Sequence, residues 1–143
     1  MTIVRSQAGE HVQVLSDTVC LKLRSNDSAN RMAVMTVEVP PGGGVPPHSH
    51  ASEEESYYML KGTMVMQLGD EEFTIEPNDF VHVPAGIAHG YQNNSPQPIC
   101  FLAWTVGGAI DQFFLEMAEV RDLPQDLPKM AAILDKYGIQ MQP

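Results

Sequence analysis

Residues 42–62 read GGGVPPHSHASEEESYYMLKG, and this stretch is the strongest guide to both the fold and the chemistry of the chain. His48 and His50 are two positions apart, so on an extended strand both imidazoles project from the same face. Glu55 opens the next predicted strand, close enough for its carboxylate to join them. Two imidazoles and one carboxylate on neighbouring strands indicate a metal site.

A fourth donor comes from a later segment. His89 follows the turn PAG at residues 84–86 and begins another predicted strand. Imidazole and carboxylate together suit a divalent transition metal (Mn, Fe, Ni, Co, Zn or Cu), whereas metals that require thiolates are disfavoured. We therefore predict one such ion bound by His48, His50, Glu55 and His89. Glu53 and Glu54 compete with Glu55 for this role, and we expect both to be solvated.

The middle of the chain is predicted to form short β-strands separated by Gly and Pro turns. Residues 31–39 alternate in a strand-like way, and residues 99–106 (ICFLAWTV) form the most apolar run, which predicts a buried strand. Many short strands with frequent turns indicate an all-β sandwich or barrel. The predicted strands are 12–15, 18–23, 31–39, 55–60, 63–68, 72–75, 80–83, 89–93 and 99–106.

The tail, residues 108–143, has a helical pattern instead. Apolar residues recur at i, i+3, i+4 and i+7, which is one face of a helix: Ile110, Phe113, Phe114 and Met117. A second helix is predicted over residues 128–137, with Gly138 in the left-handed position that ends it and Ile139 packing back on Leu134. We expect a single domain, residues 1–143, in which two helices follow a barrel.

Composition limits the partners. The formal net charge is -10, with 8 Lys+Arg against 18 Asp+Glu, and so acidic a surface repels nucleic acid and anionic membranes. No apolar run approaches the roughly 20 residues of a membrane helix, and the N-terminus lacks the apolar core of a signal peptide. Cys20 and Cys100 are isolated, which is typical of reduced thiols. We expect a cytoplasmic protein that binds a small molecule and neither nucleic acid nor membrane.

At these residues the sequence resembles the cupin family. The first segment is similar to the first cupin motif, G(X)5HXH(X)4E(X)6G, and the second to the motif G(X)5PXG(X)2H(X)3N. The positions in register are Gly42, His48, His50, Glu55, Gly62, Pro84, Gly86, His89 and Asn93. Asn78 replaces the opening Gly of the second motif, and Asn also tolerates positive φ. The match covers roughly residues 30–106.

This resemblance implies a jelly-roll barrel, the cupin double-stranded β-helix, with a metal inside and often a dimer. The tail segments GGAIDQFF and AAILDKYGIQ resemble the C-terminal helices of small cupins of the quercetin-dioxygenase-like kind. Apolar surface on both sides of residues 31–39 and 99–106 further predicts a homodimer with N-terminal strands at its interface.

Strand parity suggests the walls of a substrate pocket. Tyr57 and Met59 share the parity of Glu55, and Tyr91 shares that of His89. His82 is expected to pack or hydrogen-bond away from the metal. Three functions fit these residues: a dioxygenase-like enzyme for an enolisable or aromatic substrate in which Glu55 is also the catalytic base, a non-oxidative isomerase, cyclase or lyase, and a binding module without turnover.

Overall fold

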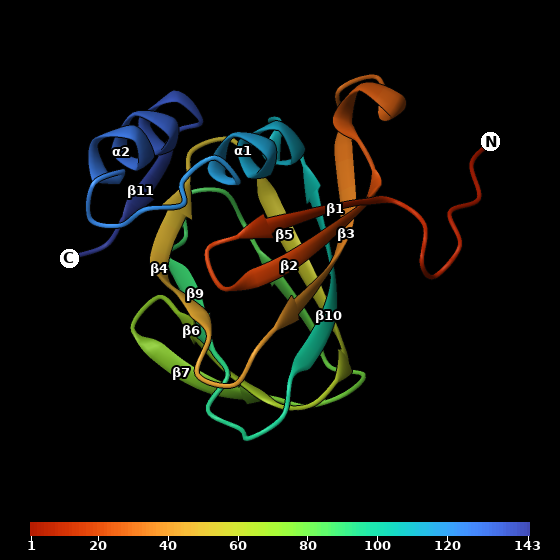
Figure 1. The fold of residues 1–143 in the computed structure, drawn as a ribbon. Helices are drawn as coiled ribbons and strands as arrows, with labels where there is room; N and C mark the ends of the chain where they lie inside the picture. Colours follow the sequence, from red (N-terminus) through yellow and green to blue (C-terminus); the bar gives the residue numbers. More distant parts are fainter.

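A computed structural model describes all residues, 1–143, as two antiparallel β-sheets and two helices (Figure 1). The strands are β1 (Glu10–Val14), β2 (Asp17–Leu23), β3 (Met32–Val39), β4 (Gly44–His50), β5 (Glu54–Lys61), β6 (Met64–Leu68), β7 (Glu71–Ile75), β8 (Phe80–Val83), β9 (His89–Gln92), β10 (Ile99–Val106) and β11 (Ile139–Met141). A short 3-10 helix, η1 (Ser25–Ser28), links β2 to β3.

The two sheets pack as a jelly roll around one core. The first contains six strands in the order β1-β2-β3-β10-β5-β8, and the second contains five in the order β11-β4-β9-β6-β7. Inward-facing side chains of both sheets form the apolar core, in which Met35, Met64 and Phe101 are almost fully buried. The all-β class and the barrel predicted from the strand pattern are confirmed.

The alternation along β10 differs from the expectation of a wholly buried strand. Ile99, Phe101 and Ala103 face the core, while Trp104 is half-buried and Val106 is exposed. The outward side chains are apolar but face the outside of the barrel. The uninterrupted apolar run therefore did not reveal that one face of the strand is buried in the core and the other lies on the outside of the barrel.

Helices α1 (Ile110–Met117) and α2 (Leu127–Lys136) lie side by side at one end of the barrel (Figure 1). Ile110, Phe113 and Met117 are buried, so the predicted face of α1 packs on the barrel. Neither helix is long and apolar enough to cross a membrane.

The C-terminal segment ends α2 and then adds a short strand to a sheet. Gly138 has the expected left-handed backbone, with φ of +66°. Ile139 then starts β11, which pairs with β4 in the register Ile139↔His50. This strand was not predicted, because three residues carry too little alternation to show. It supports the strand that carries two of the histidines.

Candidate metal centre

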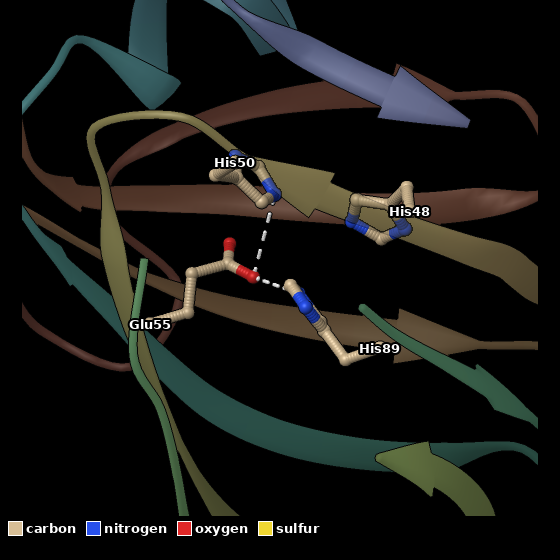
Figure 2. A group of neighbouring side chains, drawn as sticks. All are labelled: His48, His50, Glu55 and His89. Atoms are coloured by element: carbon tan, nitrogen blue, oxygen red, sulfur yellow. Dashed lines mark hydrogen bonds and ion pairs between the residues drawn. The ribbon is translucent and has the colours of Figure 1, made fainter. Parts of the chain in front are cut away.

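The four predicted ligands come together inside the barrel (Figure 2). His48 and His50 lie on β4, Glu55 on β5 and His89 on β9. One ligand atom from each lies within 4.8 Å of all the others, and all four residues are buried. The register His48↔His89 places two of the rings on directly paired residues of one sheet, and Glu55 reaches them from the other sheet.

Backbone carbonyls orient two of the rings. Nδ1 of His48 lies 2.9 Å from the carbonyl oxygen of Pro46, and Nδ1 of His89 lies 2.9 Å from that of Ile87. A neutral ring that donates from Nδ1 to a carbonyl would present the lone pair of Nε2 to a metal ion, whereas without the ion Nε2 of His89 is in hydrogen-bond contact with Glu55. Nε2 of His89 lies 2.5 Å from Oε2 of Glu55, so this nitrogen faces the centre of the group.

The third ring faces a carboxylate that the sequence analysis had placed in solvent. Nδ1 of His50 lies 3.5 Å from Oε2 of Glu53, and both side chains are buried. The expectation of a solvated Glu53 was therefore wrong, whereas Glu54 is exposed as expected. Gly108 explains the burial of Glu53, because a Cβ at that position would overlap its carboxylate.

The protonation of the group follows from its burial and its charges. Burial, together with the neighbouring His89, lowers the pKa of His48 to about 4. Burial also acts to lower the pKa of His50, but Glu53 and Glu55 outweigh it, and that pKa is raised. Burial opposes ionisation of Glu55, yet its hydrogen bond to His89 and the nearby histidines hold its pKa at about 2. Glu55 is therefore an anion at neutral pH.

The donor set fits a metal ion. Both ring nitrogens of His50 are buried without a hydrogen-bond partner, which is costly for a group that can ligate or donate. Three imidazoles and one carboxylate are ligands for divalent ions with borderline character. The four residues together are compatible with a single metal ion.

A cavity of about 210 Å³ adjoins this group. Of its 25 lining residues, 19 are hydrophobic, and they come from both sheets, α1 and α2. His48, His50 and Glu55 also line it. Leu15 and Leu123 line both this cavity and a groove on the outer surface, so they lie between the two.

The pocket residues expected from parity divide into two groups. Tyr57 and Tyr91 line the cavity, and the hydroxyl of Tyr57 donates to Oε2 of Glu55 at 2.8 Å. Met59 does not line it but is fully buried in the apolar core. Parity correctly placed Met59 on the inner face of β5, but it gives no depth along the barrel.

Two histidines stay out of the group. His82 lies 3.0 Å from the hydroxyl of Ser56 through Nδ1 and 3.6 Å from Glu54 through Nε2, on the outside of the barrel. His11 is exposed beside the outer groove. His82 was expected to lie away from the metal ligands, and this expectation is confirmed.

Comparison with known proteins agrees with the fold and the motifs. The family described as "Cupin domain" matches residues 35–105. Quercetin 2,3-dioxygenase from Bacillus subtilis is 37% identical over 62 residues, which are 43% of this chain but only 18% of that enzyme. The chain thus spans a small part of this curated relative.

Solved structures with the same fold include enzymes of several kinds. The polyketide cyclase RemF from Streptomyces resistomycificus has a TM-score of 0.64 at 26% identity, over 74% of this chain and 79% of that one. A predicted oxalate decarboxylase from Thermotoga maritima has a TM-score of 0.68 at 24% identity, over 73% and 98%. The jelly roll, the motif positions and the family match together define the class. Residues 35–105 are a cupin domain, and the chain has the fold of a small cupin.

Proposed function

We propose that this chain is a metal-dependent, dioxygenase-like enzyme that acts on a small enolisable or aromatic substrate. The observation that carries the proposal is the position of Glu55, an ionised carboxylate that belongs to the histidine group and also lines an apolar cavity. The local similarity to quercetin 2,3-dioxygenase from Bacillus subtilis supports this direction.

The cavity restricts the size and polarity of the substrate. At about 210 Å³ it is smaller than the roughly 300–1,000 Å³ of pockets for drug-sized ligands. Its lining is mostly apolar, with Phe113 and Phe114 of α1 in the wall. A molecule of one or two rings fits these properties, and the apolar wall excludes water from the reacting group.

Glu55 is the proposed base. Its carboxylate accepts a hydrogen bond from Tyr57, and this contact fixes its orientation beside the cavity. Because the pKa of Glu55 is low, about 2, the carboxylate is a weak base and would take a proton only from a hydroxyl that the bound ion has acidified. This favours an enol or a phenol as substrate over an aliphatic alcohol.

The four ligands would hold a divalent transition metal (Mn, Fe, Ni, Co, Zn or Cu), and the bound ion supplies Lewis acidity toward a substrate oxygen. Contacts outside the centre orient the three imidazole rings. The carbonyl oxygens of Pro46 and Ile87 contact His48 and His89, and the carboxyl group of Glu53 contacts His50. In the dioxygenase reaction both oxygen atoms enter the substrate, so no external reductant is required.

A second candidate is a non-oxidative enzyme such as a cyclase, isomerase or lyase. The likeness to the polyketide cyclase RemF, which covers about three quarters of both chains, favours it. In this alternative Glu55 moves a proton of an enolisable substrate and oxygen takes no part.

Aerobic and anaerobic assays of the same metal-loaded protein separate the candidates. We expect consumption of small catechols or enolisable ketones with matching oxygen uptake. Glu55→Gln keeps the size of the side chain but removes the base, so it should retain metal and lose most turnover. Glu54→Gln, the exposed neighbour, is the matched control. Undiminished turnover without oxygen would replace the dioxygenase with the non-oxidative enzyme, and binding without consumption would leave a binding module.

A further inference from the structure

Away from the ligand group, the cavity wall contains one more carboxylate. Asp17, the first residue of β2, lines the cavity and is 4% exposed. The hydroxyl of Tyr91 donates to its Oδ2 at 2.5 Å, and the hydroxyl of Ser16 donates to Oδ1 at 3.2 Å. Neither of the proposed functions uses this pair.

Asp17 has no counter-charge. No lysine, arginine or histidine lies within ion-pair distance of it, unlike Asp111, which pairs with Arg24. A buried carboxylate without a cation is unfavourable, and its two hydrogen bonds satisfy only part of its capacity of about four acceptor sites. A carboxylate with free acceptor sites in a mostly apolar wall is suited to bind a ligand group that donates a hydrogen bond.

Asp17 and Glu55 lie on different parts of the wall. Both belong to the six-stranded sheet, but β3 and β10 separate β2 from β5. Across the sheet this is three spacings of about 4.8 Å, and the register adds an offset along the strands, because Thr18 pairs with Glu38 of β3 whereas Glu55 lies level with Ala33. A ligand that reaches both must have two polar ends joined by an apolar body.

We infer that Asp17 is a second substrate anchor, which accepts a hydrogen bond from a hydroxyl at the end of the substrate remote from the histidine group. The inference rests on the proposed function in that the histidine group binds the other end. It narrows the substrate to a small aromatic or enolisable molecule with a second, distant hydroxyl. An ammonium group is disfavoured because moving a full charge into a cavity with 19 hydrophobic lining residues costs more than moving a hydroxyl.

The test measures binding without turnover. Protein loaded with redox-inert Zn²⁺ is titrated without oxygen with 1,5-, 2,6- and 2,7-dihydroxynaphthalene, and with 1- and 2-naphthol, which lack the far hydroxyl. At least one diol should bind about tenfold or more tightly than its naphthol, since a site that hydrogen-bonds a hydroxyl discriminates against the analogue without it. In Asp17→Ala the ratio should fall to within about twofold.

Two further variants make the result specific. Asp17→Asn keeps the size and a carbonyl acceptor for Tyr91, so it should fold and show a reduced ratio. Asp27→Asn removes the same charge from an exposed position in η1 and should leave the ratio unchanged.

The inference is overturned if the wild-type protein binds diols and naphthols equally, if no probe binds, or if Asp17→Ala keeps the full ratio. Tighter binding of 6-(aminomethyl)-2-naphthol, whose benzylic amine is protonated at neutral pH, than of the diols would also overturn it, in favour of a cationic ligand. The measurement does not depend on turnover. If the protein prefers diols but never consumes oxygen, the dioxygenase proposal is rejected and the assignment of Asp17 as a substrate anchor is retained.

Discussion

Oε2 of Glu53 lies 3.5 Å from Nδ1 of His50, and both side chains are buried three positions apart in the chain. Nε2 of the same ring lies 3.5 Å from Oε2 of Glu55 (Figure 2). The imidazole is therefore placed between the carboxylates of Glu53 and Glu55. Glu53 is the carboxyl group in contact with the ring nitrogen that faces away from the centre. A carboxylate in that position orients a ligating ring and raises its basicity.

Glu53→Gln should therefore weaken metal binding without removing a ligand. We expect the affinity for Zn²⁺ to fall about 10- to 100-fold, the usual effect of losing a partner of a ligating histidine. Competition with a chromophoric chelator measures it. Glu54→Gln is the matched control, since Glu54 is exposed and adjacent in sequence. Equal affinities of the two variants would show that Glu53 does not act through His50.

Metal binding should also depend on pH through His50. Burial lowers the pKa of His48 to about 4, so that ring is neutral at pH 5 to 7 and offers no proton to displace. The pKa of His50 is raised because Glu53 and Glu55 outweigh burial, so this ring holds its proton more tightly than an ordinary histidine. A metal ion must displace that proton.

The expected result is a fall in Zn²⁺ affinity of about tenfold per pH unit below the pKa of His50, starting above the ordinary histidine value of about 6.5. Chelator competition between about pH 8 and pH 5 follows it. In Glu53→Gln the fall should begin at lower pH, because one of the groups that raises this pKa is gone. A flat affinity over the whole range would count against the site.

An exposed apolar surface on the six-stranded sheet is the interface that we propose for the predicted homodimer. On the outer face of the six-stranded sheet, Phe80 is 56% exposed and stacks on Trp104 at 5.9 Å between ring centroids. Leu60 and Val106 are exposed on the same sheet. Since these side chains lie on β8, β5 and β10 rather than on the N-terminal strands, we propose that a second copy covers this part of the sheet.

Phe80→Glu should convert a dimer into a monomer, because it places a charge in an apolar interface. Phe73→Glu is the control, since Phe73 is 42% exposed but lies on β7 in the other sheet. Light scattering over a wide concentration range gives the mass. A wild-type mass of one chain throughout would contradict the dimer.

The contrast between Glu55 and Glu53 shows how far the sequence could predict the site. The sequence predicted the four ligands because they occur at fixed spacings on strands, where a period of two determines which side chains share a face. These residues are His48, His50, Glu55 and His89. Glu53 lies in the link between β4 and β5, where no strand period applies. Only two features of the sequence pointed to its burial beside His50: its spacing of three from His50, and the glycine at 108 that leaves room for its side chain.

Contacts between distant segments were beyond the reach of sequence patterns. Asp17 and Tyr91 are 74 positions apart, and no local pattern joins them. The same holds for β11, whose partner β4 lies far upstream. Strand boundaries were predicted well where Gly or Pro marks a turn, as at β8 and β10, since those residues determine the backbone locally.

The last prediction concerns the stability of Asp17. Burial raises its pKa, with hydrogen bonds from Tyr91 and Ser16 offsetting part of the effect. The folded state thus binds this proton more tightly than the unfolded state, and stability decreases as pH rises from the ordinary pKa through the raised one. Asp17→Asn should stabilise the metal-free protein at pH 7 by about 1 kcal/mol, a rise of a few degrees in melting temperature, and by nothing below both pKa values. Thermal unfolding with chelator at pH 7 and about pH 3 tests this, with Asp27→Asn as the exposed control. Destabilisation by Asp17→Asn at pH 7 would make the carboxylate a structural element, whereas higher stability with weaker diol binding is expected of a residue whose charge serves the ligand.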